Sequence, residues 1–86
     1  MTKNVIIYTS AHCHYCIEAK KLLDRKGIEY SEVRIDVEPT RLQEMIERSG
    51  RRTVPQIFIN HKSIGGFTDL LALEKSGALD KLLQEA

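Results

Sequence analysis

Both cysteines of this 86-residue chain lie in residues 10–23, which read SAHCHYCIEAKKLL. They are Cys13 and Cys16, with two residues between them. A CxxC pair can form a structural disulfide, bind a metal or carry out redox chemistry. Which of these applies depends on the elements of secondary structure on either side of the pair.

The pair lies between a predicted strand and a predicted helix. Residues 5–8 (VIIY) are β-branched and aromatic, which favours a buried strand. Apolar side chains then recur at the spacing of one helix face: Cys16, Ala19, Leu22 and Leu23. They predict a helix over residues 13–26, ended by Gly27. Alternating apolar and polar residues predict a second strand over residues 28–36, parallel to the first because a helix connects them.

The second half of the chain predicts a helix, two strands and a last helical stretch. A helix is expected between Pro39 and Gly50, with an apolar stripe of Leu42, Met45 and Ile46. Residues 56–59 predict a strand, and a tight turn leads into a short strand at residues 63–64. These two strands must be antiparallel, because the turn is too short for a crossover. After Gly65 and Gly66, leucines predict a final helical stretch to residue 83.

The resulting order, β-α-β-α-β-β-α, predicts one α/β domain over residues 1–86. We expect a four-stranded mixed sheet with helices on both faces. A CxxC pair beside a β-α-β unit is typical of a thioredoxin-like fold and a redox function.

Composition excludes several function classes. Thirteen basic and twelve acidic residues give a formal charge of +1, so no strong field attracts nucleic acid or an anionic membrane. The pair Arg51-Arg52 is interpreted as part of a solvated loop. No apolar run reaches the roughly 18 residues that span a bilayer. We therefore expect a cytoplasmic protein that binds neither nucleic acid nor membrane, and in that compartment disulfides are usually transient or catalytic.

The predicted position of Cys13 suits a nucleophile. Unpaired N–H groups at a helix N-terminus stabilise an anion, and such settings lower a thiol pKa from about 8.5 to about 3.5–7.5. Cys16, one turn further into the helix, is expected to be more buried and to attack a mixed disulfide formed at Cys13. His14 either favours the thiolate when protonated or is a polar surface residue, and both interpretations stay open.

A zinc site is the alternative for the same segment. His12, Cys13, His14 and Cys16 are all potential ligands. Structural zinc sites usually combine ligands from two separate segments, and His61 alone does not complete such a set. We therefore expect no metal site.

Three separated motifs together resemble the glutaredoxin family, most closely its small bacterial dithiol members. The motifs are YTSAHCHYC, RSGRRTVPQIFI and IGGFTDLLAL, and the resemblance covers essentially the whole chain. It implies a glutathione-dependent disulfide oxidoreductase, with Cys13 as nucleophile and Cys16 as resolving thiol. The implied partners are glutathione, as co-substrate, and glutathionylated or disulfide-containing proteins. The resemblance also implies a monomer with no tightly bound cofactor.

The resemblance further implies how glutathione is bound. Thr53-Val54-Pro55 is similar to the family's cis-proline loop, in which the backbone of Val54 pairs with the cysteinyl part of glutathione. A cis bond is energetically accessible mainly before proline, so Pro55 is a suitable position for it. Tyr15 is expected to line the groove.

The motif that begins at Gly66 is similar to the segment that receives the γ-glutamyl end. The N–H groups of Thr68 and Asp69 would bind its carboxylate, and the Asp69 side chain would accept from its ammonium. Asp69 could also act as an N-terminal helix cap, and Thr53 could simply stabilise its loop by hydrogen bonding.

Two departures from the family pattern stand out. His14 replaces the usual proline, and Ser10 replaces a lysine that helps to bind the thiolate or the glycine carboxylate of glutathione. Arg41 or Arg52 would have to supply that charge. The loss of the proline also keeps open a second hypothesis, a [2Fe–2S] carrier formed by two subunits through Cys13 of each. A thioredoxin-like protein reduced by a flavoprotein is disfavoured, because the GGxxD segment would then have no function.

Overall fold

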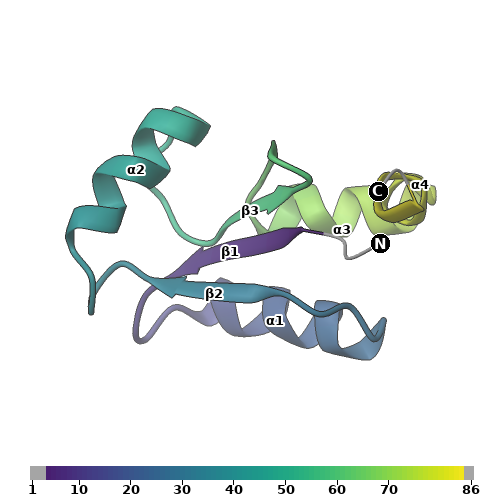
Figure 1. Cartoon of the computed structure of the whole chain (residues 1–86). Coiled ribbons are helices and arrows are strands. Elements are labelled where there is room, and N and C mark those ends of the chain that lie inside the picture. The colour runs from purple at the N-terminus through teal and green to yellow at the C-terminus, as the bar shows by residue number, and fades with distance from the viewer. Residues whose placement is uncertain (1–3, 85–86) are drawn as a thin grey trace.

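The computed structural model describes residues 4–84. Its elements are β1 (Val5–Thr9), α1 (His14–Arg25), β2 (Ser31–Arg34), α2 (Thr40–Ser49), β3 (Gln56–Ile59), β4 (Lys62–Gly65), α3 (Phe67–Ser76) and α4 (Ala78–Gln84) (Figure 1). The strands form one sheet in the order β2-β1-β3-β4. β1 and β2 are parallel, whereas β3 is antiparallel to both β1 and β4. The predicted thioredoxin-like α/β fold with a four-stranded mixed sheet is confirmed.

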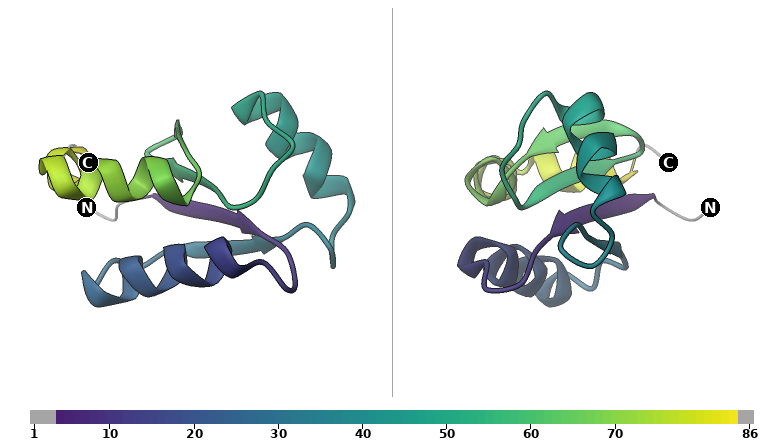
Figure 2. Two further views of the ribbon diagram at one scale, coloured as in Figure 1. Left: turned by 180° about the vertical axis from the view of Figure 1, so that it is seen from behind. Right: turned by 90° about the vertical axis from the view of Figure 1, so that its left-hand side faces the viewer.

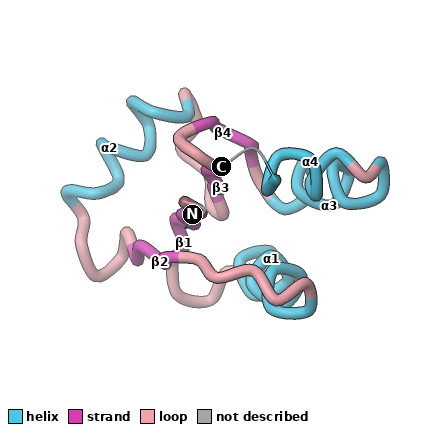
Figure 3. Tube along the Cα trace, turned by 45° about the vertical axis from the view of Figure 1, so that its right-hand side comes forward, coloured by secondary structure: helices cyan, strands magenta, loops and turns pink. Residues whose placement is uncertain are grey.

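The two faces of the sheet carry separate apolar clusters. Val5 and Ile7 on β1 pack with α1, α3 and α4, whereas Tyr8 packs on the face that α2 covers. This alternation follows from the two-residue period of a strand. Figures 2 and 3 show α2 on one side of the sheet and α1, α3 and α4 on the other. Within residues 4–84, the helices are all too short or too polar to cross a membrane.

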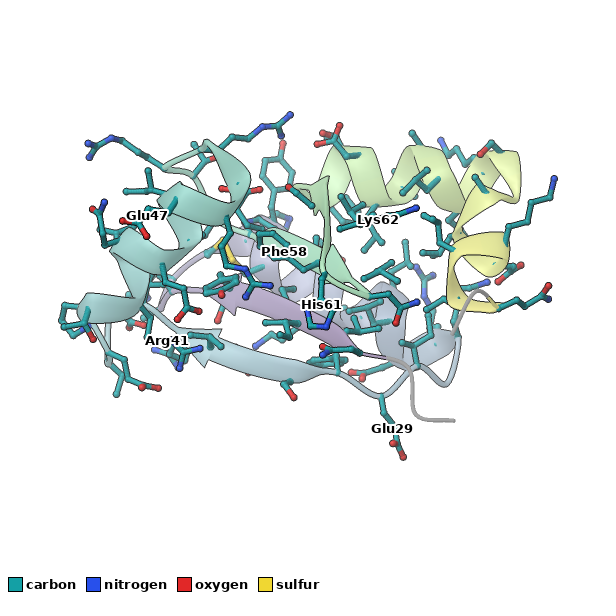
Figure 4. The ribbon with its side chains drawn as sticks, turned by 45° about the horizontal axis from the view of Figure 1, so that its top comes forward. Glu29, Arg41, Glu47, Phe58, His61 and Lys62 are labelled. Carbon is teal, nitrogen blue, oxygen red and sulfur yellow. A yellow bond between two sulfur atoms is a disulfide. The ribbon has the colours of Figure 1, made fainter. Side chains whose placement is uncertain are left out.

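The helix α2 is held to the sheet by one buried side chain and a polar network. Met45 is its only fully buried residue, whereas the other apolar residues of its predicted stripe are partly buried. The Tyr8 hydroxyl donates to the Glu44 carboxylate, and the Arg48 guanidinium lies 4.9 Å from the ring centre of Phe58 (labelled in Figure 4). Burial, followed by the Glu44 carboxylate, raises the pKa of Tyr8.

Two predicted elements are wrong in extent. The second strand covers residues 31–34, not 28–36. At its start, the Ile28 N–H donates to the Leu23 carbonyl and completes the end of α1. At its end, the Glu38 N–H donates to the Arg34 carbonyl and turns the chain. The last helical stretch is two helices, because Gly77 has a left-handed backbone (φ 82°) that ends α3.

A carboxylate at the edge of the sheet gives a pH-dependent stability. Glu32 Oε2 accepts from the Thr9 hydroxyl at 2.6 Å and pairs with the Lys20 ammonium at 2.9 Å. The Thr9 hydroxyl, followed by Lys20, lowers the pKa of Glu32 below its ordinary 4.5. The stabilisation is therefore complete above the unfolded pKa and is lost as the pH falls through the lower folded value.

We expect Glu32→Gln to lower the free energy of unfolding by about 1 kcal/mol at neutral pH. The difference from wild type should shrink as the pH falls below about 4.5, because the wild-type carboxylate then becomes protonated. Urea unfolding at several pH values measures it, with Glu47→Gln on α2 as the control. A difference that stays constant into the acid range would contradict the prediction.

Candidate active site

The cysteine pair lies at the start of α1. Cys13 is the N-cap residue, with an extended backbone, and its Sγ accepts from the Cys16 N–H at 3.1 Å. The two sulfur atoms form a disulfide, and the Cα atoms are 5.2 Å apart. Cys13 is partly exposed, whereas Cys16 is 1% exposed. The predicted difference in burial is confirmed, and only the outer sulfur is placed to meet a substrate.

The loop before β3 lies against this disulfide. The Val54–Pro55 peptide bond is cis, as predicted. The Val54 carbonyl oxygen is 3.8 Å from Cys13 Sγ, across 41 residues of sequence. Pro55 is buried, Val54 is half-buried and Thr53 is exposed. The backbone of Val54 is therefore available beside the outer sulfur.

The start of α3 provides the third segment. Gly66 is the N-cap residue, and its N–H donates to Asp69 Oδ2 at 3.0 Å. Asp69 is the third residue of this helix, and its side chain caps the helix N-terminus. Helix capping is one of the two roles expected for it from the sequence. The Arg51 guanidinium also donates to Oδ2, at 3.1 Å. The Gly66 N–H, followed by Arg51, lowers the pKa of Asp69, so the carboxylate is ionised at neutral pH.

Two glycines allow this segment to approach its neighbours. Gly65 has φ +112°, a conformation that side chains disfavour, and a Cβ there would lie 2.3 Å from Asp69 Oδ2. A Cβ on Gly66 would lie 3.3 Å from the Pro55 carbonyl oxygen. The start of α3 therefore packs directly against the cis-proline loop.

An aromatic pair connects α3 with the cysteine segment. The rings of Tyr15 and Phe67 stack, with centres 5.9 Å apart and planes 18° from parallel. Tyr15 is 58% exposed, so the stacked pair presents aromatic surface to solvent. Through these contacts the three sequence motifs meet at one place.

The comparisons with known proteins agree with this geometry. The family model for glutaredoxin matches residues 5–64. The chain belongs to the glutaredoxin family. Glutaredoxins are thiol–disulfide oxidoreductases, and the Cys13–Cys16 pair is suited to their dithiol site.

Individual glutaredoxins match over nearly the whole chain. Glutaredoxin 3 of Escherichia coli K12 is 53% identical over 81 residues, which cover 94% of this chain and 98% of that protein. The solution structure of a glutaredoxin from Brucella melitensis is 54% identical, with a TM-score of 0.81 over 93% of this chain and 87% of that one. A buckwheat glutaredoxin–glutathione complex is 30% identical, with a TM-score of 0.88 over 96% of this chain and 78% of that one.

The basic residues near the glutaredoxin site have different partners. Arg41 pairs with Glu44 at 3.0 Å on α2 (Figure 4), and Arg52 is exposed in the loop. Arg51 is exposed in the loop, as interpreted from sequence, and also forms an ion pair with Asp69. Because 18 residues separate the two partners, no local pattern indicated this contact.

The histidines do not assemble around the cysteines. His14 is exposed, with Nε2 3.8 Å from the Glu18 carboxylate. His61 lies in the turn between β3 and β4, at the end of β3 remote from Pro55 (Figure 4). Within residues 4–84, no three His, Cys, Asp or Glu side chains are grouped in a way that could hold a metal ion.

Proposed function

We propose that this glutaredoxin uses glutathione to reduce glutathione mixed disulfides and protein disulfides. The observation that supports the proposal is the meeting of three segments beside the partly exposed Cys13. Cys13 lies at a helix N-terminus, the Val54 carbonyl lies 3.8 Å from its Sγ, and the start of α3 with Asp69 packs against the same loop.

Cys13 acts as the nucleophile in this proposal. The N-terminus of α1 stabilises its thiolate, which attacks the glutathione sulfur of a glutathionylated protein. A bond between Cys13 and glutathione forms, the original disulfide breaks, and the protein leaves as a thiolate that takes up a proton. A second glutathione thiolate then attacks this mixed disulfide. Oxidised glutathione leaves, made of the glutathione taken from the protein and the one free glutathione consumed, and the Cys13 thiolate is restored.

Cys16 acts as the resolving thiol for protein disulfides. Cys13 first forms a mixed disulfide with the substrate protein. The Cys16 thiolate attacks Cys13 Sγ and releases the reduced substrate. This step leaves the Cys13–Cys16 disulfide, which is the bond present in the structure. Two glutathione molecules then reduce it.

The other two segments would bind glutathione. The backbone of Val54, in the loop that also contains Thr53 and Pro55, pairs with the cysteinyl part of glutathione. The ring of Tyr15 lines the groove.

The γ-glutamyl end would lie at the start of α3, beside Gly66. The N–H groups of Thr68 and Asp69, in the first turn of that helix, bind its carboxylate. Both hydrogen bonds to Asp69 use Oδ2. Within residues 4–84 its Oδ1 accepts none, so this atom can receive the ligand's ammonium.

We also propose that one chain acts alone, as a single-domain monomer in the cytoplasm. Every group of the proposed site comes from the same chain, and the glutathione pool of that compartment is reducing. No tightly bound cofactor is needed, because glutathione carries the electrons. Among residues 4–84, no feature specifically supports the iron–sulfur carrier hypothesis.

Comparing two reductants tests the proposed function. With a glutathionylated substrate, turnover with glutathione should exceed turnover with cysteinylglycine by at least about tenfold in kcat/KM, because the dipeptide lacks the γ-glutamyl group. Each rate is corrected for the uncatalysed reaction. Equal values would show that the start of α3 does not recognise the γ-glutamyl end, and an inactive protein would refute the proposal.

Asp69→Asn separates helix capping from charge recognition. The amide oxygen can still accept from the Gly66 N–H, whereas the negative charge beside the ligand's ammonium is lost. We expect the KM for glutathione to rise about tenfold with little change in kcat. Steady-state kinetics measures the change, and urea unfolding should show a loss of less than about 1 kcal/mol.

Asp80→Asn is the matched control, because it removes the same charge from α4, where Asp80 pairs with Lys26. Its KM for glutathione should equal that of wild type. If both variants changed KM equally, the effect would belong to overall charge and not to Asp69.

A further inference from the structure

A polar side chain is buried directly behind the cis-proline loop. Gln56 is the first residue of β3 and is 0% exposed. Its Nε2 donates to the Thr53 hydroxyl oxygen at 3.2 Å. Within residues 4–84 its Oε1 has no hydrogen-bond partner. Exchanging the amide oxygen and nitrogen would leave the other atom unpaired instead, so one half of this buried amide lacks a partner in either orientation.

Packing alone does not explain an amide at this position. Gln56 pairs across the sheet with Tyr8. Because alternate residues of a strand share a face, Gln56 lies on the same face as Phe58, which α2 covers. That face carries the apolar cluster of Tyr8, Val33, Met45 and Phe58, and an unpaired polar atom in such surroundings is unfavourable. A methionine of similar length would fill the space without one. The feature that only the amide provides is its hydrogen bond to Thr53.

That hydrogen bond connects the core to the reacting sulfur. Thr53 is exposed, so its hydroxyl gains its fixed position from Gln56 and not from burial. The next residue, Val54, places its carbonyl oxygen 3.8 Å from Cys13 Sγ. The backbone of this loop is thus held from behind, by a residue that lies inside the protein.

We propose that Gln56 is a positioning residue for the glutathione site, which orients the backbone of Val54 through Thr53. This inference rests on the proposed function. When the hydrogen bond is absent, the loop samples other conformations, and binding must select the competent one. The loss therefore appears in substrate affinity. The chemical step depends on Cys13 and is affected little.

A double-mutant cycle tests the coupling. Gln56→Met removes the amide from the core side, and Thr53→Val removes the hydroxyl from the exposed side. Each single variant should raise the KM for a glutathionylated substrate about five- to tenfold, with kcat within about twofold of wild type. The double variant should have the same KM as either single variant, because both changes break one hydrogen bond. Gln43→Met, on the exposed face of α2, is the matched control and should leave KM unchanged.

Backbone dynamics provides a measurement that does not require activity. In the oxidised protein without glutathione, the amide order parameters of Thr53 and Val54 should fall from about 0.85 toward 0.6 in both single variants. The order parameters of the amides of β3 should stay unchanged. Gln56→Met should unfold at a urea concentration no lower than wild type, because it removes an unpaired acceptor from the core. A merely structural role would instead lower stability and affinity together.

The possible outcomes distinguish the two proposals. Suppose that wild type is active with glutathione. If the single variants then have an unchanged KM, or if their effects on KM add in the double variant, the positioning role is overturned. If wild type is inactive, the proposed function fails, and the order parameters still decide whether Gln56 holds the loop. In that second case, increased loop motion in both single variants supports the hold of Gln56 on the loop, and unchanged motion overturns it.

Discussion

Replacing Cys13 with serine is expected to lower turnover of a glutathionylated substrate by at least about a thousandfold. A serine hydroxyl is almost entirely protonated at neutral pH, even at a helix N-terminus, and it cannot form the mixed disulfide. The measurement is glutathione-dependent release of the substrate thiol, with the uncatalysed rate subtracted. Substantial remaining activity would show that the exposed sulfur is not the nucleophile.

Cys16→Ser is the matched control for the same chemical change. Cys16 is buried behind Cys13, so its loss leaves the nucleophile and the glutathione groups in place. This variant should retain most activity on glutathionylated substrates and lose most activity on protein disulfides. If the two variants were equally inactive on the glutathionylated substrate, the assigned division of roles would be wrong.

Gly65→Ala is expected to have the second largest effect. The backbone at φ +112° disfavours a side chain, and the added Cβ would lie 2.3 Å from Asp69 Oδ2. We expect a loss of about 2–4 kcal/mol in the free energy of unfolding, from the strained backbone and the displaced helix cap. Displacement of the Asp69 carboxylate should also raise the KM for glutathione about tenfold.

Gly77→Ala separates backbone strain from the collision with Asp69. Gly77 also has a positive φ, +82°, but an added Cβ there would have open space around it. Apart from its neighbours in the chain, no atom of residues 4–84 would lie within 4 Å of that Cβ. We expect a loss of about 1–2 kcal/mol and an unchanged KM. Urea unfolding and steady-state kinetics on both variants measure the difference. Equal effects of the two substitutions on KM would argue against a specific contact at Gly65.

The main elements of the fold could be predicted because each has a local pattern. Runs of β-branched and aromatic residues identified β1 and β3, and Cys16, Ala19 and Leu22 identified the buried face of α1. The start of β2 could not be predicted, because the backbone of Ile28 is used to complete α1, although its side chain continues the alternating pattern. The division of the last helix depends on the left-handed backbone of Gly77, which the pattern of leucines does not reveal.

The site was predictable where chemistry lies within one motif. The cysteine pair and the cis-proline loop were found in this way. Arg51 and Gln56 were missed, because their roles depend on partners or burial that the sequence pattern does not show. An arginine in a loop is usually solvated, and a glutamine at the start of a strand is expected to face water. Their contacts with Asp69 and Thr53 follow from the folded chain.

The disulfide joins residues only three apart, both at the start of α1. A crosslink that closes so short a loop restricts the unfolded chain less than a long-range disulfide does. The apolar clusters on both faces of the sheet are formed almost entirely by other residues. The apolar core is therefore nearly the same in the oxidised and the reduced protein. Breaking the disulfide leaves both apolar clusters in place, so the chain can pass between its oxidised and reduced forms as a folded protein.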